Sequence, residues 1–126
     1  MTDAGAFSDE VIERLRTERE VRIETRRPPD GPVHKTIIWV VVDGGRAYVR
    51  TYLGARSRWY REALAHPDVT LWLGKDAVPV RVVPATDPAQ VEAVSRGFEA
   101  KYPRSQSTAA MVRDEVLETT LELLAR

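Results

Sequence analysis

Two tight turns, each set between stretches of strand-forming residues, constrain the fold of this chain more than any other feature. The run Val33–Val42 is rich in β-branched residues and leads directly into Asp43–Gly45. Glycines accept the positive φ angles of a two-residue hairpin turn, so the chain is expected to return as a partner strand over 46–53. A second hairpin is expected over 69–85, with its turn at 74–76. Most strands should therefore pair antiparallel with their neighbours in sequence.

Capping residues and the spacing of apolar residues indicate the remaining elements. Ser8 is a good N-cap, and Asp87 followed by Pro88 is typical of a helix start. The last segment, 116–124, fits either a strand or a helix, and its two adjacent threonines favour the strand. The expected order is a helix from Ser8 to Glu20, a strand at 21–25, a loop at 26–32, the first hairpin, a short helix at 57–65, the second hairpin, a helix at 88–102, a polar loop with a helical turn at 104–113 and the final strand.

These elements predict one domain of class α+β, mainly β, over residues 1–126. Six strands on a chain of 126 residues, with helices between and after them, favour a small antiparallel barrel with the helices packed outside. The run from Ile37 to Val42 is apolar on both faces, so this strand should be covered on both sides. Residues 1–20 would add an N-terminal tail and helix to the barrel.

Composition and charge exclude several classes of function. The chain has no cysteine, which removes disulfides, iron–sulfur clusters and thiol nucleophiles, and its two histidines lie far apart, so no metal site is expected. With 19 basic and 19 acidic residues the net charge is zero, which argues against nucleic acid or an anionic membrane as a partner. No apolar run is long enough to span a membrane and no signal-peptide core is present, so the protein is expected in the cytoplasm.

One stretch of the chain is strongly basic. Between Gly44 and Arg61 there are five arginines and no acidic residue. Arg50 and Thr51 lie on the predicted returning strand, and Arg56 and Ser57 lie at the predicted helix start, where unpaired amides and the helix dipole favour an anion. Guanidinium groups bind phosphate in a two-pronged manner, so the stretch predicts a phosphate cradle. The alternative is a solvated face whose arginines pair with nearby carboxylates.

Other candidate residues have both a ligand-binding and a structural interpretation. Lys35 and Thr36 begin the long predicted strand and are either ligand contacts or an exposed strand start. Trp59, next to the arginines, would line a pocket for a flat ring or pack in the core, and Trp39 is a core candidate. No Ser-His-Asp set and no carboxylate pair can be assembled, so no catalytic residue is assigned and an enzymatic activity stays open.

Two long segments resemble a known superfamily. The runs TIIWVVVDGGRAYVRTY and GARSRWYREALAHPDVTLWL are similar to the split-barrel proteins that bind FMN or deazaflavin and are related to pyridoxamine-phosphate oxidase. The tail segments FEAKYPRS and TTLELLAR, taken with TIIWVVV and YVRTYLGARSRWYR, resemble more closely a small bacterial family of unknown function within that superfamily. The resemblance covers roughly residues 20 to 126.

The resemblance implies a six-stranded split barrel that forms a homodimer, with FMN or a deazaflavin bound between the subunits. Residues around Lys35, Thr36 and Trp39 lie where relatives contact the ring system of the cofactor, and Trp39 or Trp59 would pack near that ring. The superfamily binds the cofactor phosphate with the returning strand and the helix start, and the matching positions here are Arg50, Thr51, Arg56, Ser57 and Arg58.

The leading hypothesis is therefore a flavin- or deazaflavin-binding, oxidoreductase-like protein whose redox chemistry belongs to the cofactor. The alternative is a cofactor-free module of the same fold that binds a small anionic or aromatic molecule in the dimer groove.

Overall fold

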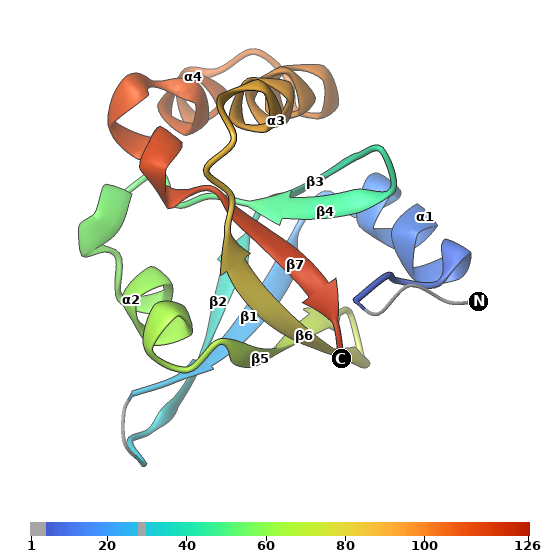
Figure 1. The fold of residues 1–126 in the computed structure, drawn as a ribbon, viewed down its shortest axis with the longest axis vertical. Coiled ribbons are helices and arrows are strands. Elements are labelled where there is room, and N and C mark those ends of the chain that lie inside the picture. Colours follow the sequence, from blue (N-terminus) through green and yellow to red (C-terminus); the bar gives the residue numbers. More distant parts are fainter. Residues whose placement is uncertain (1–4, 28–29) are drawn as a thin grey trace.

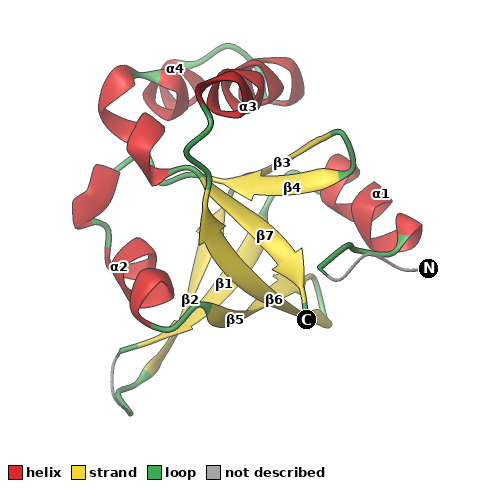
Figure 2. Ribbon diagram, in the orientation of Figure 1, coloured by secondary structure: helices red, strands yellow, loops and turns green. Residues whose placement is uncertain are grey.

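Seven strands form one antiparallel sheet that curls into a half-barrel, and helices lie around it (Figures 1 and 2). The computed structural model describes residues 5–27 and 30–126, so the first four residues of the predicted tail and two residues of the predicted loop at 26–32 lie outside it. The elements are α1 (Asp9–Thr17), β1 (Val21–Arg26), β2 (Val33–Ile38), β3 (Val40–Asp43), β4 (Arg46–Val49), the 3-10 turn η1 (Gly54–Arg56), α2 (Arg58–Ala65), β5 (Asp68–Leu73), β6 (Asp76–Pro84), α3 (Pro88–Lys101), α4 (Gln106–Val112), the 3-10 turn η2 (Asp114–Thr119) and β7 (Leu121–Ala125).

Both predicted hairpins are present, and each turn has two residues. Asp43 pairs with Arg46, and the intervening Gly44 and Gly45 have φ angles of 58° and 78°. Positive φ at both central residues defines the turn whose twist matches that of the flanking strands. In the second hairpin β5 pairs with β6, and Gly74, with φ 62°, opens the turn. Local turn chemistry therefore determines two of the strand pairings.

The long strand predicted over 33–42 is interrupted at Trp39, and this break raises the number of strands from the predicted six to seven. The sheet order is β2-β1-β5-β6-β7-β4-β3, so the two halves of the run form the two opposite edges of the sheet. The prediction that the run is covered on both sides is wrong for β2, where Val33 and Ile37 are 43% and 54% exposed. Because β2 is an edge strand on a curved sheet, its outer side chains face away from the core.

Three other expected boundaries differ from the structure. The strand predicted over 46–53 ends at Val49, since the chain leaves the sheet there to reach η1 and α2. The polar loop predicted at 104–113 contains the helix α4, whose N-cap Ser105 accepts a hydrogen bond from the Thr108 amide at 3.1 Å. The final segment is a strand only from Leu121 onward, and η2 precedes it.

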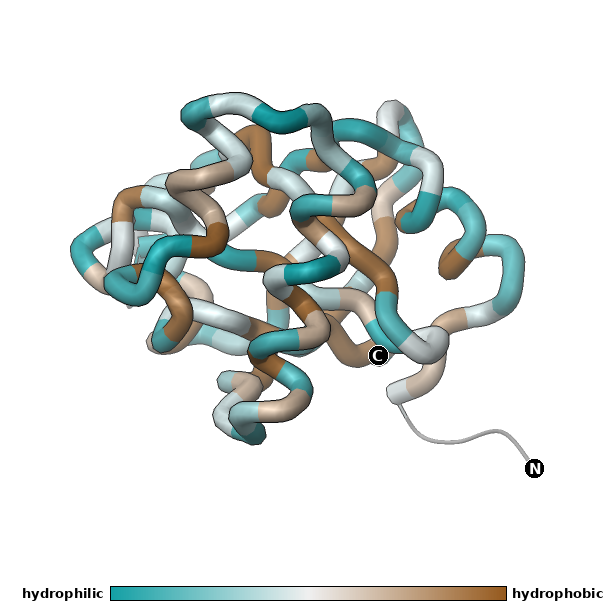
Figure 3. The backbone as a smooth tube through the Cα atoms, turned by 90° about the horizontal axis from the view of Figure 1, so that it is seen from above, coloured by the Kyte–Doolittle hydropathy of each residue, from teal (hydrophilic) through white to brown (hydrophobic). Residues whose placement is uncertain are grey.

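The apolar core has two parts. The first fills the inside of the curled sheet and includes Ile23, Leu71 and Leu123, all 1% exposed or less. The second lies between β3, β4 and α3 and includes Tyr48 and Phe98, both fully buried. Figure 3 shows brown, apolar segments mainly toward the interior of the tube and teal, hydrophilic segments mainly at its outer turns. No helix in the described part of the chain is long and apolar enough to cross a membrane.

Side chains from the end of α3 hold the break at Trp39 in place. The Tyr102 ring stacks on Trp39 with centroids 3.9 Å apart and planes within 5°. The Tyr102 hydroxyl accepts a hydrogen bond from the Val40 amide at 3.1 Å and donates to the Arg19 carbonyl at 2.7 Å. Lys101 Nζ donates to the Val40 carbonyl at 2.6 Å. These contacts satisfy backbone groups at the point where the run changes from one sheet edge to the other.

This arrangement gives the stability of the protein a defined pH dependence. Burial lowers the pKa of Lys101 from 10.5 to about 8. Between these two values the unfolded chain binds more protons than the native protein, so the free energy of unfolding should rise as the pH rises through 8. Since the side chain is only partly buried, we expect the free energy of unfolding of the native protein to rise by roughly 1 to 2 kcal/mol relative to that of Lys101→Met between pH 7 and pH 10. Urea unfolding of both proteins measures this difference, and a constant difference across that range would contradict the expectation.

Candidate functional site

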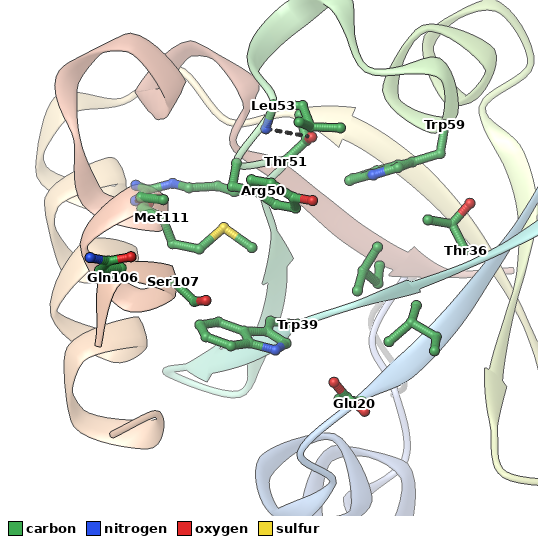
Figure 4. Close-up of a pocket in the computed structure, with 14 residues that line it drawn as sticks. Glu20, Thr36, Trp39, Arg50, Thr51, Leu53, Trp59, Gln106, Ser107 and Met111 are labelled. Carbon is green, nitrogen blue, oxygen red and sulfur yellow. Dashed lines mark hydrogen bonds between the residues drawn. The ribbon is translucent and has the colours of Figure 1, made fainter. Parts of the chain in front are cut away.

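A cavity of about 570 Å³ opens beside the break at Trp39, where the sheet edges β2 and β3 part (Figure 4). We call it the split pocket. Its walls come from the end of β2, the segment after β4, the start of α2 and one side of α4. The lining residues are Glu20, Thr36, Ile37, Ile38, Trp39, Arg50, Thr51, Tyr52, Leu53, Trp59, Gln106, Ser107, Ala110 and Met111.

Aromatic and sulfur-containing side chains give the split pocket a largely apolar interior. Trp39 is held by its stack on Tyr102, and Trp59 is only 5% exposed. In Figure 4, Trp39 and Met111 border one side of the space, and Trp59 and Thr36 lie together across it. Rigid aromatic faces at the edge of a cavity with a few hydroxyl groups suit a flat ring system that carries polar substituents.

Arg50 lines the pocket, but its guanidinium group is already hydrogen-bonded to the surrounding helices. The residue is fully buried, and Figure 4 shows the guanidinium directed away from the opening toward α4. Its nitrogens donate to Thr120 Oγ1 at 2.7 Å, Ser95 Oγ at 2.8 Å, the Val91 carbonyl at 2.7 Å and the Met111 carbonyl at 3.0 Å. Burial lowers the pKa of Arg50 to about 10, which leaves a positive charge behind the pocket wall at neutral pH. Arg50 therefore joins the end of β4 to α3, α4 and η2.

The next predicted residues divide between the pocket and its surroundings. Thr51 lines the split pocket, and its hydroxyl accepts a hydrogen bond from the Leu53 amide at 3.3 Å. Ser57 is the N-cap residue of α2, but its buried Oγ has no hydrogen-bond partner in the described part of the chain. Arg56 is exposed in η1 and does not line the pocket. Of the residues predicted to bind phosphate, Thr51 lies in the pocket wall, whereas Arg56 and Ser57 lie outside the pocket.

Arg58 and Lys35 lie on different sides of β2. Arg58 is exposed on α2, and its Nη2 donates to Thr36 Oγ1 at 3.3 Å, which places the guanidinium at the rim of the split pocket. Lys35 is exposed, and its ammonium lies 4.0 Å from the centre of the Trp72 ring. Thr36 therefore lines the split pocket, whereas Lys35 is engaged with Trp72 and does not line it. The pocket therefore brings together five of the nine predicted residues, namely Thr36, Trp39, Arg50, Thr51 and Trp59.

Sequence reasoning missed the contribution of α4. Gln106, Ser107, Ala110 and Met111 form one wall of the split pocket, but this segment was expected to be a polar loop with a helical turn. The available signal was Ser105 as an N-cap ahead of the short apolar run 109–112. Seven residues make a helix too short for a clear apolar period, so the pattern alone does not show which side faces the sheet.

The fold agrees with the one that the resemblance implied, with seven strands in place of six. A putative pyridoxamine 5'-phosphate oxidase is among the solved structures that share it. Residues 11–123 match the model of the bacterial family described as "Uncharacterized protein conserved in bacteria (DUF2255)", and the chain belongs to that family. Among curated proteins, none is similar enough in sequence to match.

Several solved structures share the fold at low sequence identity. The conserved hypothetical protein Rv2991 of Mycobacterium tuberculosis is 20% identical, with a TM-score of 0.66 over 100% of this chain and 86% of its own. HutZ, a heme storage protein of Vibrio cholerae, is 10% identical, with a TM-score of 0.67 over 96% of this chain and 91% of its own. An F420-H2-dependent reductase is 15% identical, with a TM-score of 0.64 over 85% of this chain and 94% of its own. The fold therefore occurs in proteins named for different ligands.

Proposed function

We propose that the split pocket binds the planar ring of FMN or of a deazaflavin, and that the protein is an oxidoreductase-like member of its superfamily. The observation that carries this proposal is the space of about 570 Å³ bordered by Trp39, Trp59 and Met111. A concave and mostly apolar site with a few convergent polar groups is the usual form of a cofactor site. The F420-H2-dependent reductase among the structural neighbours supports a deazaflavin as one of the two candidates.

In this proposal the pocket walls bind and orient the ring. Trp39 or Trp59 offers an aromatic face, and Thr36 and Thr51 offer hydroxyl groups to the polar edge of the ring. Arg50 adds positive charge from behind the wall and fixes α4 against the end of β4. When bound, the cofactor supplies hydride-transfer chemistry, and the chain supplies binding, orientation and the exclusion of water.

The phosphate of the cofactor would lie toward Arg58. This guanidinium is at the pocket rim, because it donates to Thr36 Oγ1, and it has further donors for a two-pronged contact with phosphate. Arg56 and Ser57 precede it at the start of α2 and remain candidates for the same phosphate. Lys35 has the least support, since its ammonium group is engaged with the Trp72 ring.

The proposal includes a homodimer with the cofactor between its subunits. Three large apolar side chains at the pocket, Ile37, Tyr52 and Leu53, are 54%, 54% and 56% exposed. Exposed apolar groups around the mouth of a pocket favour a covering partner. A second copy of the chain would bury them and enclose the ring.

Titration of the purified protein with FMN and with F420 tests the function directly. We expect one of the two to bind, with a shifted absorbance spectrum, and Arg58→Gln to weaken that binding about tenfold because one charged contact with phosphate is lost. Arg96→Gln is the matched control, since Arg96 is an exposed helix arginine paired only with Glu92 on its own helix. Hemin serves as a comparison ligand, because a heme storage protein shares the fold.

The alternative function is a cofactor-free module that holds a small anionic or aromatic molecule in the same pocket. It predicts thermal stabilisation by such a molecule and none by FMN or F420. Absence of binding by both cofactors would therefore reject the oxidoreductase proposal in favour of this alternative.

A further inference from the structure

A second cavity, of about 590 Å³, lies on the other side of the Thr36–Arg58 contact. It is formed by the exposed side of α2, the end of β1 and the start of β2. Its polar lining is Arg27, His34, Arg58, Arg61 and Glu62. We call it the arginine cavity, and none of these five residues lines the split pocket.

Positive charge exceeds negative charge in the arginine cavity. Three arginines and one glutamate line the cavity, so the arginines bring two more positive charges than the carboxylate compensates. Within the described chain, Arg27, Arg58 and Arg61 form no ion pair with any carboxylate. Other surface arginines without an ion pair in the described chain are Arg19, Arg22, Arg26, Arg56 and Arg104. The three arginines of this cavity differ from these because they line one common space.

The one carboxylate of the cavity is already engaged. Glu62 is 6% exposed, and its Oε1 accepts a hydrogen bond from Thr25 Oγ1 at 2.8 Å and lies 3.2 Å from His34 Nδ1. Burial raises the pKa of Glu62, but these hydrogen bonds and the charges of His34 and Arg58 outweigh it, so its pKa lies below the usual value. Glu62 is therefore held by Thr25 and His34, and it forms no ion pair with the three arginines of the cavity in the described chain.

We propose that the arginine cavity is a second binding site, beside the split pocket and sharing Arg58 with the cofactor site proposed there, for a small dianion of the phosphate class. Arginines from α2 and from the end of β1 line one space, and planar guanidinium groups match the geometry of phosphate oxygens. A dianion balances the two excess charges, whereas a monocarboxylate would leave one of them uncompensated. The ligand is inorganic phosphate or the phosphate group of a small monoester, which the cavity volume also accommodates.

The proton resonances of the two histidines of the chain report on phosphate binding at this site. His34 lines the arginine cavity, and His66 lies at the end of α2 outside it. We expect added phosphate, at constant pH and ionic strength, to shift the imidazole proton resonances of His34 and to leave those of His66 unchanged. His66→Asn assigns the two signals, and sodium chloride at matched ionic strength controls for general screening. A second titration with phenyl phosphate shows whether the cavity prefers a monoester or the free ion, because the preferred ligand of the two binds more tightly. Equal shifts at both histidines, or none, would overturn the proposal.

Substitutions distinguish this site from the split pocket. Arg61→Gln should weaken phosphate binding five- to tenfold, because one charge-assisted contact is lost. Arg104→Gln is the matched control and should not change the affinity, since Arg104 is exposed and lines neither cavity. Ala110→Trp, which narrows the split pocket, should also leave phosphate binding unchanged. If Ala110→Trp removed phosphate binding, the two cavities would form a single site and the proposal of a second site would fail, whatever the outcome of the FMN and F420 titrations.

Discussion

Replacement of Arg50 by alanine is expected to remove about 3 to 5 kcal/mol from the free energy of unfolding, a large part of the stability of a domain of this size. Arg50 is fully buried, and its side chain satisfies the Val91 and Met111 carbonyls together with the hydroxyls of Ser95 and Thr120. Truncation removes all four hydrogen bonds, and it leaves Ser95 Oγ and the Met111 carbonyl without a side-chain partner in the described chain, while Thr120 Oγ1 keeps its bond to the Leu117 carbonyl at 2.7 Å. Each unsatisfied buried polar group costs about 1 to 3 kcal/mol, and the empty volume adds to that cost.

Urea unfolding followed by circular dichroism measures the Arg50→Ala effect. Arg56→Ala is the matched control, because Arg56 is exposed in η1 and should change stability by less than about 0.5 kcal/mol. Arg50→Lys keeps the charge but not the planar set of donors, so it should be intermediate between the native protein and Arg50→Ala. A loss of stability below about 1 kcal/mol for Arg50→Ala would show that the hydrogen bonds around Arg50 do not hold the helices to the sheet.

The hairpins were predictable because their cause is local. Asp43–Gly45 and the turn at Gly74 require positive φ angles that glycine adopts without strain, and neither depends on distant parts of the chain. The break at Trp39 has no such local cause, since strand-forming residues lie on both sides of it. It exists because β2 pairs with β1 while β3 pairs with β4. Pairing between distant segments, which the pattern of one run does not contain, determines the strand count.

For the arginines of the basic stretch, too, the sequence pattern alone does not predict the environment of each side chain. In the sequence Arg46, Arg50 and Arg58 are equivalent members of one cluster. In the structure Arg46 pairs with Glu122 at 2.6 Å, Arg50 is buried among neutral acceptors, and Arg58 lies exposed at the pocket rim. Their partners come from the last third of the chain or from β2, so their environments depend on tertiary contacts. The sequence pattern does not separate the buried Arg50 from the exposed arginines of the same stretch.

The position of the split pocket follows from the break in the sheet. A sheet whose two edges belong to one continuous run must part at the residue that joins them, and that residue is Trp39. Tyr102 and Lys101 satisfy the backbone at this point, and α4 covers the opposite side of the opening. The same break that gives a seventh strand therefore gives the site its aromatic wall.

Ala110→Trp is expected to abolish binding of the cofactor to the split pocket, with a loss of affinity of roughly a hundredfold, or about 2.7 kcal/mol. Ala110 is half-buried on α4 and lines the pocket on the side that Met111 shares. An indole group at this position would occupy the space proposed for the ring, and two rigid groups do not share one volume.

Ala109→Trp is the matched control: Ala109 is the neighbouring residue of α4, it is exposed, and it does not line the pocket. Titration of both variants with whichever of FMN and F420 binds the native protein, together with their unfolding curves, separates loss of the pocket from loss of the fold. Native affinity in a folded Ala110→Trp protein would mean that the ring binds elsewhere.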